Sequence, residues 1–407
     1  MLLFLAVVSA VSARCGETDT RVITTTNAAL RLAPNSGDLV GLTWKDPELQ
    51  LIHEPRLGEN FRILLPKAGH EACYFNSRDQ IVSSIEEISD GVICRYDSLR
   101  NDDEQVPIKV RYEIRSIGGQ IEFTIEVDNP TDRKLAEVFY GILGGQQGIQ
   151  QRVDTESLIP GGYGYRNLAP HLFNQYVGSY LGIRCNAAGY NYPGAMSMGW
   201  MDVFNRKADV GYYYGNQDPE TRITALYTEL HPYAKAIAPK DNWPSSADLP
   251  PGEPVGLTMG WLNFPYTAKG VFRGGPIALQ VHKGDWHSGS GIYRSWFDQH
   301  FTVTREPNWL RKEMAWQSVI ISNSEDVITH RFNELPRLAA DAKKYGVTTF
   351  EILGWSVGGT DRGYPDYQPD PRLGSAEEFR KALADIRAIG VHPLLFANVQ
   401  VADTGSG

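Results

Sequence analysis

The chain has 407 residues and a formal net charge of −9. This length exceeds the size at which one hydrophobic core usually stops growing, so we expect more than one domain. The charges of both signs are interspersed, which excludes a basic surface, and we therefore expect no nucleic acid and no membrane among its partners. The 20 Tyr, 9 Trp and 40 Gly residues are typical of β-rich proteins with many turns.

Residues 1–13 form a short apolar segment that ends in small residues and precedes Arg14. The pattern predicts a signal peptide cleaved after Ala13, and hence a secreted or periplasmic protein. No Lys or Arg precedes the apolar segment, which leaves a truncated or buried start as the alternative. The segment is too short to cross a bilayer of about 30 Å.

Residues 20–283 have the pattern of a large antiparallel β-sandwich. Residues 108–117 and 120–127 alternate apolar and polar side chains on either side of Gly118 and Gly119, which predicts a hairpin with one face on a core. Residues 28–32 and 39–44 flank another turn in the same way. Residues 144–215 are dense in Gly, Tyr and Asn, which favours irregular connections, with aromatic ligand-binding surfaces as the alternative.

Cysteine and histidine residues give no sign of a metal or cofactor site. The four cysteines, Cys15, Cys73, Cys94 and Cys185, form no C-x-x-C pair. Cys73 and Cys94 either bridge neighbouring strands or are free buried thiols. His282, Asp285 and His287 are candidate metal ligands, but their segment is more typical of a domain junction, so we expect no metal and no cofactor.

The pattern changes near residue 300. Residues 284–313 predict a helical linker, with an amphipathic helix over residues 285–301. Residues 314–407 then alternate strands at 318–322, 348–355 and 392–399 with helices at 334–345 and from Ser375 onward, where a capping box begins the helix. This order predicts a parallel sheet, the first three βα units of an incomplete (β/α) barrel of the TIM type.

A long loop marks the candidate site. Residues 356–374 follow the second parallel strand, whereas ordinary βα loops have about two to six residues. The loop lies at the carboxyl end of a strand, which is the catalytic face of such barrels. Its carboxylates and tyrosines suit a saccharide, because carboxylates hold hydroxyl groups and rings stack on sugar faces. The predicted substrate-binding residues are Trp355, Asp361, Tyr364, Asp366, Asn398 and Gln400.

Two structural alternatives compete with this prediction. Aspartate beside proline builds turns, so Asp361, Asp366 and Asp370 could serve the loop itself. Trp355 is expected to share one strand face with Glu351 and Leu353 at the mouth of a pocket, but a buried Trp that completes the core is the alternative. Catalytic residues are not identified.

Several segments resemble known glycosidase families. The segment DNPTD at residues 128–132 resembles a strand connection of galactose-mutarotase-like sandwiches. The segment KGDWH at residues 283–287 is similar to the linker that leads to the barrel in several glycosidase families. Residues 353–366 resemble the second-strand region of a glycosidase-related family of unknown function. Its broader relatives are the α-galactosidase clan and the endo-α-N-acetylgalactosaminidases.

The resemblance implies hydrolysis of O-glycosidic bonds in oligo- or polysaccharides by two carboxylates. Those carboxylates are expected beyond residue 407, because a (β/α)8 barrel needs roughly 250 residues. We therefore expect a C-terminally truncated glycoside hydrolase that is inactive alone. The clan's acidic pair before Gly-Trp is replaced by Ile352 and Leu353, so that sugar-binding role is not carried over. The alternatives are a non-catalytic carbohydrate-binding protein acting through the β-sandwich and a sugar epimerase built on the sandwich alone.

Overall fold

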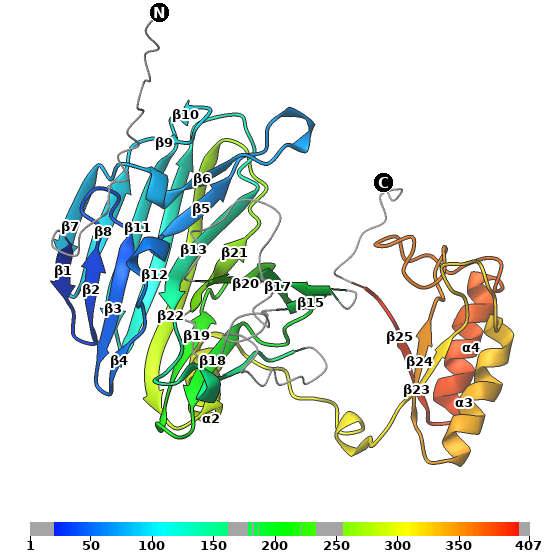
Figure 1. Ribbon diagram of the computed structural model, residues 1–407. Coiled ribbons are helices and arrows are strands. Elements are labelled where there is room, and N and C mark those ends of the chain that lie inside the picture. The colour runs from blue at the N-terminus through cyan, green and yellow to red at the C-terminus, as the bar shows by residue number, and fades with distance from the viewer. Residues whose placement is uncertain are drawn as a thin grey trace, which may run out of the picture. The chain divides into compact units, whose positions relative to one another are not determined.

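The computed structural model describes residues 20–161, 178–180, 183–185, 187–220, 222–232 and 255–398. The chain divides into two compact units, Met1–Phe301 and Thr302–Gly407. Figure 1 shows that the first unit is built mainly of strands and that strands and helices alternate in the second. Among the described residues, no helix is long and apolar enough to cross a membrane. The predicted signal peptide lies outside the described residues.

Antiparallel sheets make up the first unit. The larger sheet has, in spatial order, β14 (Glu156–Leu158), β18 (Trp200–Asn205), β19 (Val210–Asn216), β22 (Gly270–Lys283), β12 (Gln120–Asn129), β11 (Lys109–Ile117), β8 (Gly91–Tyr96) and β7 (Ser84–Ile88). The second has β17 (Ala187–Tyr192), β20 (Thr224–Pro232), β21 (Val255–Asn263), β13 (Glu137–Gln146), β5 (Phe61–Leu64) and β6 (Tyr74–Asn76). The smaller sheets are β1 (Arg21–Thr24), β2 (Ala28–Leu32), β3 (Leu39–Lys45) and β4 (Glu48–Gln50); β9 (Leu99–Arg100) and β10 (Gln105–Val106); and β15 (Gly178–Tyr180) and β16 (Ile183–Cys185).

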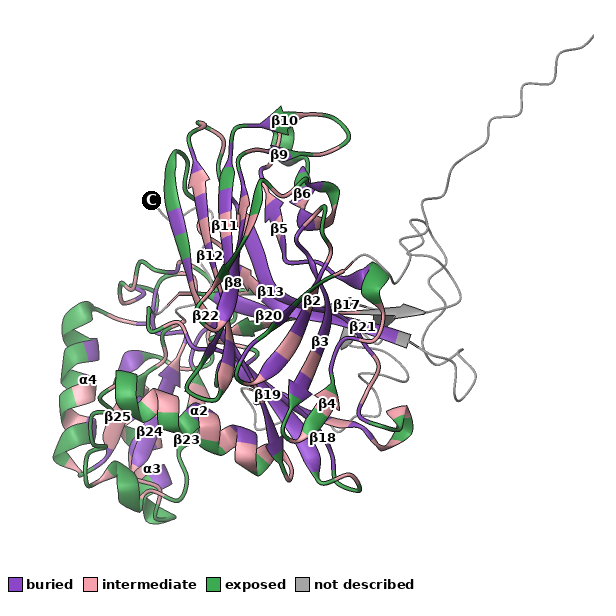
Figure 2. Cartoon of the chain, turned by 90° about the vertical axis from the view of Figure 1, so that its left-hand side faces the viewer, coloured by how far each residue is buried: buried purple, intermediate pink, exposed green. Residues whose placement is uncertain are grey.

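The two larger sheets of the first unit share one hydrophobic core. It includes Phe123 and Ile125 of β12 together with Val138 and Tyr140 of β13. Buried and half-buried residues alternate along the whole of β12, as Figure 2 shows by colour. This alternation is the sequence pattern that predicted a hairpin, and β11 pairs with β12 in the expected antiparallel register. The prediction of an antiparallel β-sandwich is confirmed for the described residues.

Helix α2 (Trp286–His300) packs against this sandwich. Its Tyr293 joins a second apolar cluster with Trp200 and Phe204 of β18 and Tyr213 of β19. Every residue of β18 and β19 is therefore buried, because the helix covers the face that would otherwise be exposed. The prediction of irregular connections over residues 144–215 is wrong for these strands, since burial on both faces removes the alternation that identifies a strand.

The second unit has the predicted order of strands and helices. The elements are β23 (Gln317–Ile320), α3 (Leu335–Lys344), β24 (Thr349–Leu353), α4 (Ala376–Ala388) and β25 (His392–Leu395). The strands are parallel in the order β23-β24-β25, and Figure 1 shows both helices on one face of the sheet. Phe350 and Ile352 of β24 pack there against Phe379 and Ile386 of α4. The described residues supply three strands, so a closed barrel is not shown.

Helix ends in the second unit follow the predicted signals. Ser375 Oγ accepts the Glu378 N–H (3.1 Å), and the Glu378 carboxylate accepts the Ser375 N–H (2.6 Å). Gly346 and Gly390 follow α3 and α4 with φ of 81° and 74°, a conformation that favours glycine. These signals determine the residue at which each helix ends and the chain turns towards the next strand.

Candidate functional site at the carboxyl edge of the parallel sheet

The loop of residues 356–374 is fastened across the carboxyl ends of all three parallel strands. Thr360 donates from its backbone N–H and its Oγ1 to Ser322 O, just beyond β23 (both 3.1 Å). Tyr367 Oη donates to Asn398 O, beyond β25 (2.6 Å). The loop therefore gathers side chains from separate βα units at one edge of the sheet.

Inside the loop, two stretches run side by side. Val357 N–H donates to Gln368 O (2.9 Å), and Ser356 forms an isolated antiparallel bridge with Pro369. Gly359 has φ of 78°, and a Cβ there would lie 2.4 Å from Asn323 O. The chain can pass this close to the end of β23 only with glycine at this position. The loop is thus an ordered structure that can hold side chains in fixed places.

Trp355 begins the loop, and its indole is buried. It stacks on Phe379 of α4 (ring centroids 5.7 Å apart) and is only 8% exposed. The prediction that Trp355 shares a face with Glu351 is wrong, because Gly354 has φ of 71° and breaks the alternation of the strand. Trp355 lies on the helix side with the core residues, and its Nε1–H donates to Phe396 O (2.9 Å). It completes the core and holds the chain beyond β25 in place.

Glu351 lies on the opposite face of the sheet, as predicted. It follows Phe350 and precedes Ile352, both of which point into the helix layer. Its carboxylate accepts a hydrogen bond from Ser318 of β23. The polar partner explains why a carboxylate is tolerated in the middle of the sheet.

Asp361 and Asp366 are both exposed at the outer part of the loop. Asp361 has φ of 64°, and its backbone N–H donates to Tyr364 Oη (3.0 Å). Tyr364 is buried (2% exposed) with its ring 5.3 Å from that of Tyr367, and burial raises the pKa of its hydroxyl. The two tyrosines therefore form the base on which the Asp361 carboxylate is presented to solvent, while Asp366 lies nearby in sequence at the surface.

Asp370 stabilises the loop through an ion pair with Arg372. Its carboxylate accepts hydrogen bonds from Arg372 Nε (3.0 Å) and Nη2 (2.7 Å), and Arg372 Nη1 also donates to Asp326 (2.9 Å). Burial alone raises the pKa of Asp370, but the hydrogen bonds from Arg372 outweigh it and hold the pKa below its usual value. For Asp370, the alternative of a turn-building aspartate is therefore favoured.

The third strand contributes its carboxyl end. Asn398 is half-buried, and its backbone carbonyl accepts the hydrogen bond from Tyr367 Oη. Gln400 lies outside the described residues.

Sequence reasoning missed Ser322, which is fully buried at the end of β23 with an Oγ that has no hydrogen-bond partner among the described residues. The only signal was a polar residue directly after the first parallel strand.

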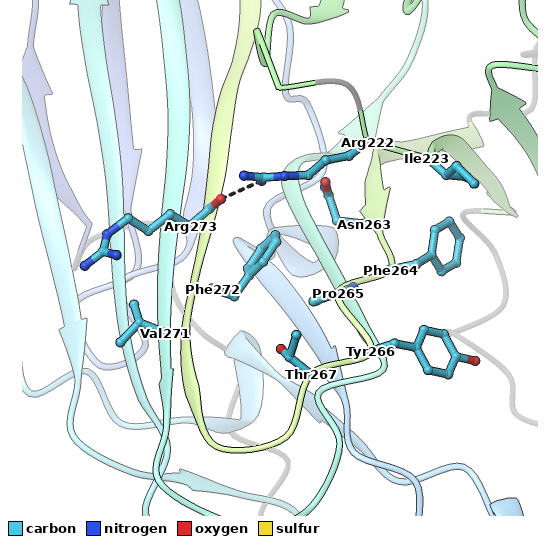
Figure 3. A pocket seen from close by; sticks show the side chains of 10 residues that line it. All are labelled: Arg222, Ile223, Asn263, Phe264, Pro265, Tyr266, Thr267, Val271, Phe272 and Arg273. Carbon is cyan, nitrogen blue, oxygen red and sulfur yellow. Dashed lines mark hydrogen bonds between the residues drawn. The ribbon is translucent and has the colours of Figure 1, made fainter.

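The sandwich carries a separate pocket. It lies where β21 leads into β22, with a volume of about 680 Å³. Figure 3 shows the side chains that line it, among them Arg222, Asn263, Tyr266 and Phe272. A hydrogen bond joins Arg222 Nη1 to Arg273 O (2.6 Å) at its edge. No sequence motif marked this pocket.

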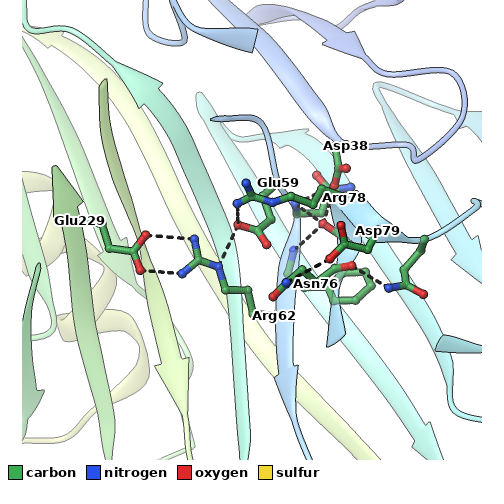
Figure 4. A network of polar contacts seen from close by, with 11 residues as sticks. Asp38, Glu59, Arg62, Asn76, Arg78, Asp79 and Glu229 are labelled. Carbon is green, nitrogen blue, oxygen red and sulfur yellow. Dashed lines mark hydrogen bonds and ion pairs between the residues drawn. The ribbon is translucent and has the colours of Figure 1, made fainter. Parts of the chain in front are cut away.

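The sandwich also buries a charged network, shown in Figure 4. Glu59 is fully buried and accepts from Arg62 Nε (2.8 Å) and Arg78 Nη2 (2.5 Å). Arg62 also makes a bidentate pair with Glu229 of β20 (2.7 and 3.1 Å). Asp38 lies in the same network, and burial raises its pKa to about 7. The Glu59 and Glu229 carboxylates balance the two guanidinium groups, and Asp38 is held by Ser77 and the Asn60 N–H, so the network ties strands together rather than offering charge to a ligand.

Asp202 and His282 form a second buried pair, under helix α2. His282 Nε2 lies 2.8 Å from Asp202 Oδ2, and His282 Nδ1 lies 3.1 Å from Lys283 O. A Cβ on Gly289 of α2 would lie 1.9 Å from Asp202 Oδ2, so the helix approaches the pair closely. His287 instead pairs with Asp285 at the helix start (2.7 Å). The two histidines of the suggested metal site therefore face different carboxylates.

Cys73 and Cys94 are both free and buried. Cys73 Sγ donates to Glu104 Oε1 (3.2 Å), whereas Cys94 Sγ lies 3.5 Å from Gly37 O. Of the two alternatives, free buried thiols are the one observed.

Comparison with known proteins gives a family model for part of the chain. Residues 275–406 match a domain of unknown function, DUF6259. No curated protein matches the sequence. The match includes α2 and the whole of the described parallel sheet, which is the part of the chain that carries the candidate site.

Solved structures with a similar fold are glycoside hydrolases. The α-N-acetylgalactosaminidase NagBb from Bifidobacterium bifidum aligns with a TM-score of 0.58 and 14% identity in a complex with Gal-NHAc-DNJ, covering 92% of this chain and 57% of that chain. Its complex with GalNAc gives 0.58 and 13%, covering 92% and 58%. An α-galactosidase from Lactobacillus brevis aligns with a TM-score of 0.42 and 11% identity, covering 95% and 56%. This chain thus spans less than two thirds of the length of these glycosidases, and it has a glycosidase-like fold.

Proposed function

We propose that the full-length protein is a glycoside hydrolase that acts on O-glycosidic bonds of oligo- or polysaccharides. The observation that carries the proposal is the loop that places Asp361, Tyr364 and Asn398 together at the carboxyl edge of a parallel sheet. That edge is where barrel enzymes bind their substrates. The fold similarity to an N-acetylgalactosaminidase supports the same class of reaction.

In this proposal the described loop binds the sugar, and the catalytic carboxylates belong to later strands of a closed barrel. The Asp361 carboxylate accepts hydrogen bonds from sugar hydroxyl groups, and the Tyr364 hydroxyl fixes the backbone that carries it. Asn398 offers an amide group beyond the third strand, and Asp366 is exposed on the loop. Gln400 lies outside the described residues and is included on its sequence position alone. Trp355 acts indirectly, because it is buried in the core and positions the chain beyond β25.

We also propose that the protein is exported, since residues 1–13 have the pattern of a signal peptide. Its carbohydrate substrate would then be met outside the cytoplasm. Determining the N-terminal residue of the mature protein tests this directly: a start at Arg14 supports export, and retention of Met1 on protein purified from its native source contradicts it.

Substitution of Asp361 tests the binding role. Hydrolysis of p-nitrophenyl α-N-acetylgalactosaminide and α-galactoside is measured on the full-length protein and on its Asp361→Asn variant. We expect kcat/KM to fall about 10- to 100-fold, because a charge-assisted hydrogen bond contributes about 1.5–3 kcal/mol.

Asp132→Asn is the matched control, since Asp132 is exposed on the first unit. Its kcat/KM should match that of the wild type. Equal rates for the Asp361→Asn variant and the wild type would contradict the assigned role of Asp361. Failure of the full-length protein to hydrolyse either substrate or a broader panel of aryl glycosides would contradict the proposed activity.

A further inference from the structure

The pocket between β21 and β22 has the size and lining of a small-ligand site. Its volume of about 680 Å³ falls within the range of about 300–1,000 Å³ that such sites occupy. Its lining is mostly apolar, with a few polar groups, from Arg222, Asn263, Tyr266, Thr267 and Arg273. All of these residues belong to the first unit.

The polar centre of the pocket is the Asn263 side chain. Asn263 is only 1% exposed, yet its Oδ1 has no hydrogen-bond partner within the part of the chain that the structure describes. The neighbouring Tyr140 Oη donates its proton to Gly275 O (2.6 Å) and also interacts with the Asn263 amide, so Oδ1 is the Asn263 atom left without a partner. Buried polar groups in folded proteins are nearly always paired, so an unpaired amide oxygen facing a pocket indicates a ligand.

Arg222 makes the pocket polar without giving it a free charge. Its guanidinium pairs with Asp218 Oδ2 (3.1 Å) and with Glu220, and it donates to Arg273 O (2.6 Å). Two carboxylates therefore surround one cation, so the pocket does not favour an anionic ligand. Because Arg222 is neutralised in this way, the pocket favours a neutral ligand that both donates and accepts hydrogen bonds.

Aromatic rings supply the apolar surface. Phe272 is buried at 9% exposure, with the Arg222 guanidinium 5.5 Å from its ring centroid. Figure 3 shows the Phe272 ring and the Asn263 side chain lying below Arg222. Tyr266 lines the same pocket and is 63% exposed, and its φ of 51° is unusual for a bulky residue. An exposed ring held in a strained conformation beside a pocket is the kind of feature that binding sites retain.

We propose that this pocket binds one neutral pyranose residue of a carbohydrate. The Asn263 Oδ1 accepts a hydrogen bond from one sugar hydroxyl group, which gives this buried acceptor the partner it lacks. The Tyr266 ring packs on the apolar C–H face of the sugar. The site needs no hydrolysis and uses no residue of the carboxyl-edge loop, so it stands independently of the proposed catalytic activity.

The test is monosaccharide binding to the 407-residue chain, measured by calorimetry and saturation-transfer NMR. The probes are methyl α-D-galactopyranoside, N-acetyl-D-galactosamine and methyl α-D-glucopyranoside. We expect saturable binding of at least one with a Kd of about 1 mM, as is reasonable for a ligand of this size. Asn263→Leu should weaken that binding at least 10-fold without lowering the melting temperature, because it removes an unpaired buried amide oxygen.

A second variant keeps the test decisive if Asn263→Leu does not fold. Tyr266→Ala changes an exposed side chain and should weaken binding about 3- to 10-fold at an unchanged melting temperature. Tyr345→Ala is its matched control, since Tyr345 is 87% exposed on the second unit, and it should bind as the wild type does. Absence of saturable binding of all three sugars up to 100 mM overturns the proposal. Undiminished affinity in the Tyr266→Ala variant, or in a folded Asn263→Leu variant, also overturns it.

Discussion

The sandwich and the loop of the second unit use polar side chains in opposite ways. In the sandwich, Glu59 and Asp202 are fully buried and each faces a cationic or protonatable partner. In the loop, Asp370 is likewise buried and paired with Arg372, but Asp361 and Asp366 are exposed. The difference indicates that buried charge here holds the scaffold together, whereas exposed charge on an ordered loop is available to a ligand.

Removing Arg62 should have the largest effect on the sandwich. Arg62→Met leaves the fully buried Glu59 with Arg78 alone and leaves Glu229 without its bidentate partner. We expect the free energy of unfolding of the first unit to fall by about 3–5 kcal/mol, the usual result of breaking a buried ion pair. Urea unfolding followed by tryptophan fluorescence measures it.

Arg95→Met is the control for that change. Arg95 pairs with Glu86 at 3.1 Å, but their side chains are 40% and 54% exposed. Surface pairs contribute about 0–1 kcal/mol, so this variant should be nearly as stable as the wild type. Equal losses of stability in the two variants would show that the buried Arg62 network contributes no more than the exposed Arg95–Glu86 pair.

The stability of the second unit should depend on apolar packing beneath the loop of residues 356–374 rather than on buried ion pairs. Trp355→Ala removes an 8%-exposed indole from the core of the second unit, together with its hydrogen bond to Phe396 O. We expect a loss of about 3–5 kcal/mol confined to that unit, seen by calorimetry as a lower transition temperature. Trp316→Ala, at a 66%-exposed position, should change it by less than about 0.5 kcal/mol. A loss for Trp355→Ala as small as that for Trp316→Ala would place Trp355 outside the core.

The fold of the second unit could be predicted because each local signal agreed with the next. The capping box at Ser375, the glycines after both helices and the apolar period of α4 all gave the correct elements. The position of Trp355 could not be predicted, because a single left-handed residue, Gly354, turns the following side chain to the other face. Strand periodicity carries no information about such a residue.

The first unit shows a second limit of the sequence. Alternation identified β11 and β12, which have one face on the core. It failed for β18 and β19, because α2, more than 70 residues later in the chain, buries their other face. The pocket at Asn263 was missed for a related reason. Its lining comes from separate segments that only the folded chain brings together.

Helix α2 gives a matched pair of glycine substitutions. Gly289→Ala would place a Cβ 1.9 Å from Asp202 Oδ2, whereas Gly291 has open space around the same atom. We expect Gly289→Ala to lower the free energy of unfolding of the first unit by about 1–3 kcal/mol, through overpacking. Gly291→Ala should raise it by about 0.5–1 kcal/mol, because alanine favours the helix. Thermal unfolding of both variants measures the difference, and the same sign for both would contradict the close approach of α2.

The smallest expected effect is a pH dependence of the first unit. Burial lowers the pKa of His282, but the hydrogen bond and charge of Asp202 outweigh it, and the net pKa lies above 6.5. Burial raises the pKa of Asp202 itself to about 6, despite the opposing effect of His282. Both groups therefore bind protons more tightly in the folded protein than in the unfolded chain.

It follows that this pair stabilises the first unit most at low pH and that its contribution falls as the pH rises. The Asp202 part is lost between its unfolded pKa near 3.8 and about 6, and the His282 part is lost as the pH passes through its raised value. Wild type and His282→Gln should thus differ in the slope of stability against pH from 4 to 8, because the variant lacks the His282 part. His300→Gln, at an exposed position of helix α2, is the control and should keep the wild-type slope. Identical slopes for wild type and His282→Gln would mean that folding does not change the proton affinity of His282. The buried pair would then differ from the exposed carboxylates of the loop in its packing alone.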